Sequence, residues 1–121
     1  MLRQIVVELR VIFIDGSVSS EAAQHGYDAI QSGVINIGTL DRVGRNARSR
    51  KNIAASGLPA MPGKDRDEFL PAVLEPSGSR VSVRSISSKD NKSAGGQIGG
   101  QLRGVKDGTT VIVIPINVPR K

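Results

Sequence analysis

Acidic residues gather in one stretch of an otherwise basic chain, at Asp65, Asp67, Glu68 and Glu75. Carboxylates placed side by side repel one another unless a cation or a shared proton relieves the repulsion. Asn91 follows at the expected start of a helix. Carboxylates, an amide oxygen and water together form a hard-oxygen ligand set that suits Mg²⁺ or Mn²⁺. A solvated acidic loop is the alternative interpretation of the same residues.

The elements expected around these residues follow the order strand, turn, strand, helix. Residues 68–75 favour a strand, 76–79 a hairpin turn, and 80–84 a second strand in which polar and apolar residues alternate. Residues 91–103 favour a helix, which places Asn91 at its N-terminal end. This is the order of elements in a ββα-metal nuclease site.

The remaining sequence predicts a single α+β domain over residues 1–121 with an antiparallel sheet. Its expected elements are a strand at 11–14, a helix at about 20–32, an extended segment at 34–40, a helix at 41–55 and a strand at 109–116. The last strand is expected at the centre of the sheet because it is apolar on both faces.

The expected helix at 91–103 contains four glycines, Gly95, Gly96, Gly99 and Gly100. Each costs about 1 kcal/mol relative to alanine in a helix interior, so tertiary contacts must stabilise this helix. Ala94, Ile98 and Leu102 lie four apart and form its packing stripe. The glycines indicate either close packing of the helix backbone or its close approach to a phosphate or metal. Gln97 and Gln101 are expected to line a cleft or to face solvent.

Charge and composition narrow the function classes. The chain of 121 residues has 17 Lys and Arg against 11 Asp and Glu, giving a net charge of +6. A net positive charge of this size points to a polyanionic partner, and it favours nucleic acid over an anionic membrane. Aromatic residues make up only 2%, which argues against proteins that stack single-stranded bases on aromatic rings.

Several kinds of site are excluded. The chain has no cysteine and one histidine, His25, which rules out disulfides, thiolate metal sites and a multi-histidine metal site. No apolar run approaches the roughly 18 residues of a membrane span, and the N-terminal residues lack the apolar run of a signal peptide.

Basic residues are candidates for contacts with the phosphate backbone, which hold DNA without reading its bases. They are Arg42, Arg45 and Arg48 in the expected helix at 41–55, and Arg84 and Lys92 beside the acidic cluster. A solvated helix face is the alternative interpretation of the first three.

Residues 11–116 resemble the NucA/NucB family of metal-dependent deoxyribonucleases. The most specific motif is the run from Asp65 to Phe69, Asp-Arg-Asp-Glu-Phe, followed by Pro71-Ala72. The other matching segments are 57–59, 62–63, 81–84, 90–92, 94–95, 99 and 107–109, with His25, 28–30 and 39–42 upstream.

The resemblance implies a ββα-metal nuclease in which a carboxylate replaces the usual histidine base. Asp67 is then the first candidate for the general base and Glu68 the second. Asn91, together with Glu68, is the candidate ligand of Mg²⁺ or Mn²⁺. Asp65 and Arg66 are expected to support these groups or to have a structural role. His25 matches the family pattern and is expected either to have a structural or capping role or to support the site or contact a phosphate. Asp65 and Glu68 would crowd Asp67 with like charge and so adapt its pKa to act as a base near neutral pH.

The resulting hypothesis is a metal-dependent endonuclease that hydrolyses DNA with little sequence preference. We expect a monomer that acts on DNA and not at a membrane. The resemblance favours an extracellular protein, and the missing signal sequence favours a cytoplasmic one. Two alternatives remain open: a nucleic-acid-binding module without catalysis, and a toxin-type nuclease domain controlled by a protein inhibitor.

Overall fold

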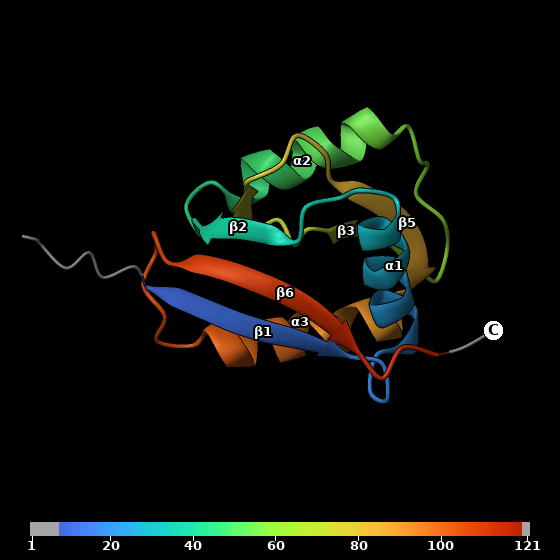
Figure 1. The fold of residues 1–121 in the computed structure, drawn as a ribbon. Helices are drawn as coiled ribbons and strands as arrows, with labels where there is room; N and C mark the ends of the chain where they lie inside the picture. The colour runs from blue at the N-terminus through green and yellow to red at the C-terminus, as the bar shows by residue number, and fades with distance from the viewer. Residues whose placement is uncertain (1–7, 120–121) are drawn as a thin grey trace, which may run out of the picture.

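Two β-sheets are joined and covered by three helices in residues 8–119, the part of the chain that the computed structural model describes (Figure 1). The elements are β1 (Leu9–Asp15), α1 (Ser20–Gln31), β2 (Ile37–Leu40), α2 (Arg45–Ser56), β3 (Lys64–Phe69), β4 (Leu74–Pro76), β5 (Ser82–Ser87), α3 (Ser88–Leu102) and β6 (Thr110–Ile116). None of these helices is long and apolar enough to span a bilayer. The α+β class is confirmed.

The larger sheet has the strand order β1-β6-β2-β4. Its core face carries alternate residues of the two long strands, Ile12 and Ile14 on β1 and Val111 and Val113 on β6, all of them buried. β6 lies between β1 and β2, which confirms its expected central position. β1 and β6 run parallel, whereas β2 pairs antiparallel with both β6 and β4. The expected all-antiparallel sheet is therefore mixed.

The smaller sheet pairs β3 with β5 in antiparallel register, and α3 follows directly. The order of two strands and a helix is confirmed, but the expected strand at 68–75 is wrong. The acidic run lies inside β3, and the chain leaves this sheet after Phe69. The buried side chains of Leu70 and Leu74 draw the following segment into the main core, where β4 joins the larger sheet beside β2.

The helices start and stop near the predicted positions. Gly33 and Gly57, which follow α1 and α2, have φ of 102° and 69°, in the left-handed region that glycine adopts without strain. α2 begins at Arg45 and not at 41. α3 begins at Ser88, where the hydroxyl of Ser87 accepts a hydrogen bond from the Asp90 amide.

The glycines of α3 do not serve close packing, so that interpretation is wrong. A Cβ added at Gly95, Gly96, Gly99 or Gly100 would meet nothing within 4 Å. Ala94 and Leu102 are buried and Ile98 packs against the core, which confirms the expected stripe. One face of α3 therefore anchors the helix and leaves its glycines open.

The two glutamines of α3 have a structural role that neither expectation covered. Gln101 accepts a hydrogen bond from the Phe13 amide and donates to the Phe13 carbonyl, both at 2.8 Å. Gln97 makes the same pair of contacts with Asp15, at 2.8 and 3.3 Å. Each side-chain amide thus replaces a neighbouring strand along the free edge of β1.

Candidate active site

The pleat of β3 sends neighbouring side chains to opposite sides. Asp65, Asp67 and Phe69 face α1 and α3, and Phe69 is buried in the core. Arg66 and Glu68 face the opposite way, toward α2 and the loop that follows it. The acidic run is therefore divided between two environments, which decides what each carboxylate can do.

Asp67 is held by a buried histidine. Its Oδ2 lies 2.7 Å from Nδ1 of His25, and Nε2 of His25 lies 2.9 Å from the hydroxyl of Ser82. The His25 side chain is 0% exposed and that of Asp67 only 16% exposed. Burial raises the pKa of the Asp67 carboxyl above its usual range, and the charges of Glu68 and Asp90 act in the same direction, while the contact with His25 opposes the shift.

Asp65 orients the side chain of Asn91. The Asn91 side chain donates from Nδ2 to Asp65 Oδ2 at 3.0 Å, and the Ser88 hydroxyl donates to the other oxygen of Asp65 at 2.8 Å. These two hydrogen bonds lower the pKa of Asp65, so it remains a carboxylate. With Nδ2 engaged in this way, the acceptor Oδ1 of Asn91 is left without a partner within residues 8–119.

Glu68 binds α2. Its two carboxylate oxygens accept hydrogen bonds from the Ser49 hydroxyl at 2.5 Å and from Nδ2 of Asn52 at 2.9 Å. No residue of α2 is buried, so these side-chain contacts are a main attachment of the helix to β3. Both carboxylate oxygens of Glu68 therefore have hydrogen-bond partners, whereas Asp67 uses only Oδ2 within residues 8–119.

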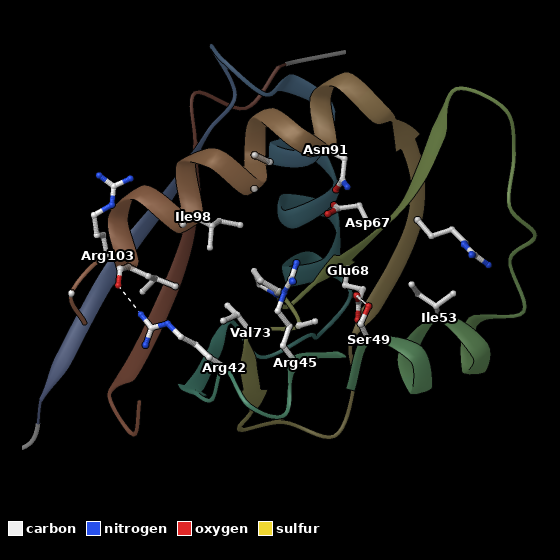
Figure 2. A pocket seen from close by; sticks show the side chains of 18 residues that line it. Arg42, Arg45, Ser49, Ile53, Asp67, Glu68, Val73, Asn91, Ile98 and Arg103 are labelled. Atoms are coloured by element: carbon white, nitrogen blue, oxygen red, sulfur yellow. Dashed lines mark hydrogen bonds between the residues drawn. The ribbon is translucent and has the colours of Figure 1, made fainter. Parts of the chain in front are cut away.

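A cleft of about 670 Å³ lies between α2 and α3. Asp67, Glu68 and Asn91 line it, so the structure brings the predicted base candidates and the predicted metal ligand together (Figure 2). The remaining wall is mixed, with apolar side chains such as Val73 and Ile98 between the acidic end and an arginine-lined rim. Of the four α3 glycines, Gly95 and Gly99 line the cleft.

The predicted DNA-binding residues fall into two groups. Arg42 donates to the carbonyls of Leu102 and Val105 and to Asp107, and Arg48 bridges Asp41 and the Ala72 carbonyl. Arg84 pairs with Asp28. Arg45 and Lys92 are exposed, and Arg45 points into the cleft (Figure 2). Arg66 is turned to the Leu58 carbonyl.

Some residues of the site carry no recognisable signal in the sequence. Ser82, Ser49 and Asn52 are small polar residues of a kind found anywhere on a surface, and only the fold brings them to carboxylates. Arg103, on the rim, follows Asn91, Gly95 and Gly99 at intervals of four, so the helical spacing could have placed it.

The oxygen atoms at the cleft suit a hard divalent cation. The described residues hold no cluster of three or more His, Cys, Asp or Glu that could bind a metal by itself. Mg²⁺ commonly uses one or two protein ligands and completes its shell with water and substrate phosphate. The free amide oxygen of Asn91 fits that pattern.

The chain is similar in sequence to a curated bacterial nuclease. It is 38% identical over 92 residues to the DNA-entry nuclease of Bacillus subtilis (strain 168), an alignment that covers 76% of this chain. The chain is NucA/NucB-like. The predicted NucA/NucB resemblance is thus confirmed. The alignment spans 61% of the relative's length. No family model matches the chain.

Proposed function

We propose that this protein is a metal-dependent endonuclease that hydrolyses DNA with little sequence preference. The observation that carries the proposal is the convergence of the Asp67 carboxylate and the free amide oxygen of Asn91 on one arginine-lined cleft. The similarity to a protein named DNA-entry nuclease supports DNA as the substrate.

Asp67 is the residue we assign as general base. Hydrolysis of a phosphodiester requires a water to lose a proton as its oxygen attacks phosphorus, in line with the bond that breaks. Asp67 is confined by His25 on one side and open to the cleft on the other. Its raised pKa makes it a better proton acceptor than an ordinary aspartate while leaving it ionised above that pKa.

Asn91 is the residue we assign to the cation, with Glu68 as the second candidate ligand. Bound Mg²⁺ or Mn²⁺ would neutralise charge on the phosphate and on the leaving oxygen. Asp65 holds the Asn91 amide so that its oxygen is the free atom. Glu68 would have to give up hydrogen bonds to Ser49 or Asn52 before acting as ligand or base, which favours Asp67 over Glu68 as base.

The exposed cations around the cleft account for binding without base recognition. Arg45 and Arg103 line the cleft and are exposed, and the exposed Lys92 follows Asn91 in the sequence. Such side chains contact phosphates and leave the base edges unread, which supports the low sequence preference. Gly95 and Gly99 leave the α3 wall of the cleft free of side chains, so a sugar-phosphate strand can approach the helix backbone.

Incubation with plasmid DNA and with RNA, each in Mg²⁺, in Mn²⁺ and in chelator, tests the proposal. We expect plasmid to be nicked and degraded in either metal and left intact in chelator. Undiminished cutting in chelator would refute the dependence on a metal. Binding without cutting under every condition would establish the non-catalytic binding module instead. Extracellular action is a proposal that rests on the family resemblance, and a monomeric state and control by a protein inhibitor are further proposals.

A further inference from the structure

A hydrogen-bonded chain of three side chains runs from the cleft into the protein interior, from Asp67 through His25 to Ser82. We infer that His25 and Ser82 are positioning residues for the reaction: they hold Oδ2 of Asp67 inside the protein and thereby present Oδ1 to the cleft as the oxygen that accepts the proton. The inference rests on the proposed nuclease function and specifies how its base is prepared.

The hydrogen bonds assign a role to each atom. An ionised carboxylate only accepts hydrogen bonds, so Nδ1 of His25 must carry the proton of the 2.7 Å contact with Asp67. A neutral ring with its proton on Nδ1 has an acceptor at Nε2, and the Ser82 hydroxyl lies 2.9 Å from that atom. The Ser82 hydroxyl can donate to that acceptor, so Ser82 complements the tautomer that Asp67 requires. Oδ1 of Asp67 makes no hydrogen bond within residues 8–119, and Asp67 lines the cleft.

The imidazole cannot turn away from this arrangement. It projects from the middle of α1, is fully buried, and meets the ring of Phe69 edge to face with the ring centroids 6.5 Å apart. The next residue, Gly26, lets α1 approach β3 closely, because a Cβ there would lie 3.0 Å from the Phe69 ring. A carboxylate held through one oxygen by a fixed ring has lost its freedom to rotate, which is the preorganisation that a general base requires.

A purely structural histidine would also be buried and bonded, so the test must separate positioning from stability. His25→Ala removes the donor, whereas His25→Asn keeps an N–H donor near the place of Nδ1. Ser82→Ala removes only the hydrogen bond at Nε2. Ser19→Ala is the matched control, because Ser19 is also 0% exposed and its hydroxyl donates to Ser93, away from the cleft.

We expect His25→Ala to lower kcat on DNA by roughly 10–100-fold with KM unchanged, the usual effect of losing a partner that orients a reactive group. His25→Asn should recover part of that loss and Ser82→Ala should show a smaller one. Ser19→Ala should lower the melting temperature without changing kcat. Rates are compared at temperatures where each variant is fully folded by circular dichroism. If His25→Ala at equal folded fraction loses no more kcat than Ser19→Ala, the positioning role is overturned.

A second measurement does not depend on activity. Nitrogen NMR of the metal-free wild-type protein should show His25 protonated at Nδ1 and unprotonated at Nε2, and Ser82→Ala should move the Nε2 resonance because that nitrogen loses its hydrogen-bond partner. A ring protonated only at Nε2 would overturn the inference. If the wild-type protein cuts no nucleic acid, the proposed function fails, while this spectrum still decides whether the hydrogen-bonded chain exists.

Discussion

Asp67 and Glu68 are neighbours in the sequence but have different hydrogen-bond partners and different proposed roles. The alternation of β3 gives Asp67 a buried histidine and an opening to the cleft, and gives Glu68 two hydrogen-bond donors from α2. A carboxylate with both oxygens engaged is a poor proton acceptor, since accepting a proton weakens the bonds that it already makes. The two residues should therefore respond differently to removal of their charge.

Asp67→Asn should lower DNA cleavage by roughly 10²–10⁴-fold, the usual contribution of a positioned general base, because the amide cannot accept the proton. DNA affinity, measured in chelator by fluorescence anisotropy, should hold or rise slightly as a negative charge near phosphate is lost. Glu68→Gln should mainly lower the melting temperature by loosening α2. Near-full activity of Asp67→Asn beside a dead Glu68→Gln would reverse the assignment of the base.

The raised pKa of Asp67 also predicts a pH dependence of stability. Between the unfolded value of about 4 and the raised folded value, the folded state binds more protons than the unfolded state. Stability contributed by this group is therefore fully present below about 4 and is lost as pH rises through the folded pKa. Urea denaturation of wild type and Asp67→Asn over this range should show the variant gaining relative stability as pH rises. A constant difference would contradict the shift.

Residue types alone predicted the candidates at the site but not their partners. The acidic run was identified because clustered carboxylates are unusual in a basic chain, and Asn91 because it stands at the start of an expected helix. Their supporting hydrogen bonds join residues such as His25 and Asp67, or Ser49 and Glu68, from different elements. No local pattern encodes such distant pairings, so only the folded chain shows them.

At the scale of the element, α3 combines a weak helix sequence with an exposed glycine face. Gly96→Ala and Gly100→Ala should each stabilise the protein by up to about 1 kcal/mol, because an added methyl group meets nothing and reduces the freedom of the unfolded chain. Thermal denaturation measures the gain, and cleavage should not change.

Gly95→Ala and Gly99→Ala provide the matched comparison. They should stabilise the helix by the same amount, but they place a methyl group inside the cleft and should weaken DNA binding. Equal activity of all four variants would show that DNA does not approach this face of α3.

Periodicity located most elements correctly and failed where the main core overrode it. The strand at 68–75 was expected because its residues are mostly apolar, yet the apolar residues serve two sheets. Phe69 fills the core beside β5, while Leu74 fills it beside β2. Which sheet each of these apolar residues joins depends on tertiary packing, and a pattern along the chain does not encode that packing.

At the scale of the whole molecule, the net charge of +6 does not translate directly into a binding surface. Arg42, Arg48 and Arg84 pair with acids or carbonyls of the protein, and Arg48 is only 15% exposed in its side chain. Charge reversal at Arg48 should therefore destabilise the fold, so it cannot serve as a clean test of DNA binding. Arg45 can, because it is exposed and points into the cleft.

Arg45→Glu should weaken DNA binding and lower the slope of log K against log salt by about 0.9, the value for one lost phosphate contact on duplex DNA. The control is Arg10→Glu, an equal charge change on exposed β1. Affinities at several salt concentrations, with the melting temperature measured alongside, decide the outcome. An identical slope for Arg45→Glu and wild type would assign Arg45 to ordinary surface.

The side-chain amides of Gln97 and Gln101 also bear on solubility. An unpaired strand edge is a template on which another chain can add and begin an aggregate, and β1 carries exposed apolar residues at Leu9, Val11 and Phe13. The two glutamines occupy this edge at Phe13 and Asp15 with groups that cannot be extended into a further strand. Replacing both by alanine should increase light scattering on storage at high concentration, more than the loss of folding stability alone explains. The glycine-rich helix beside the cleft would then also protect the molecule from self-association.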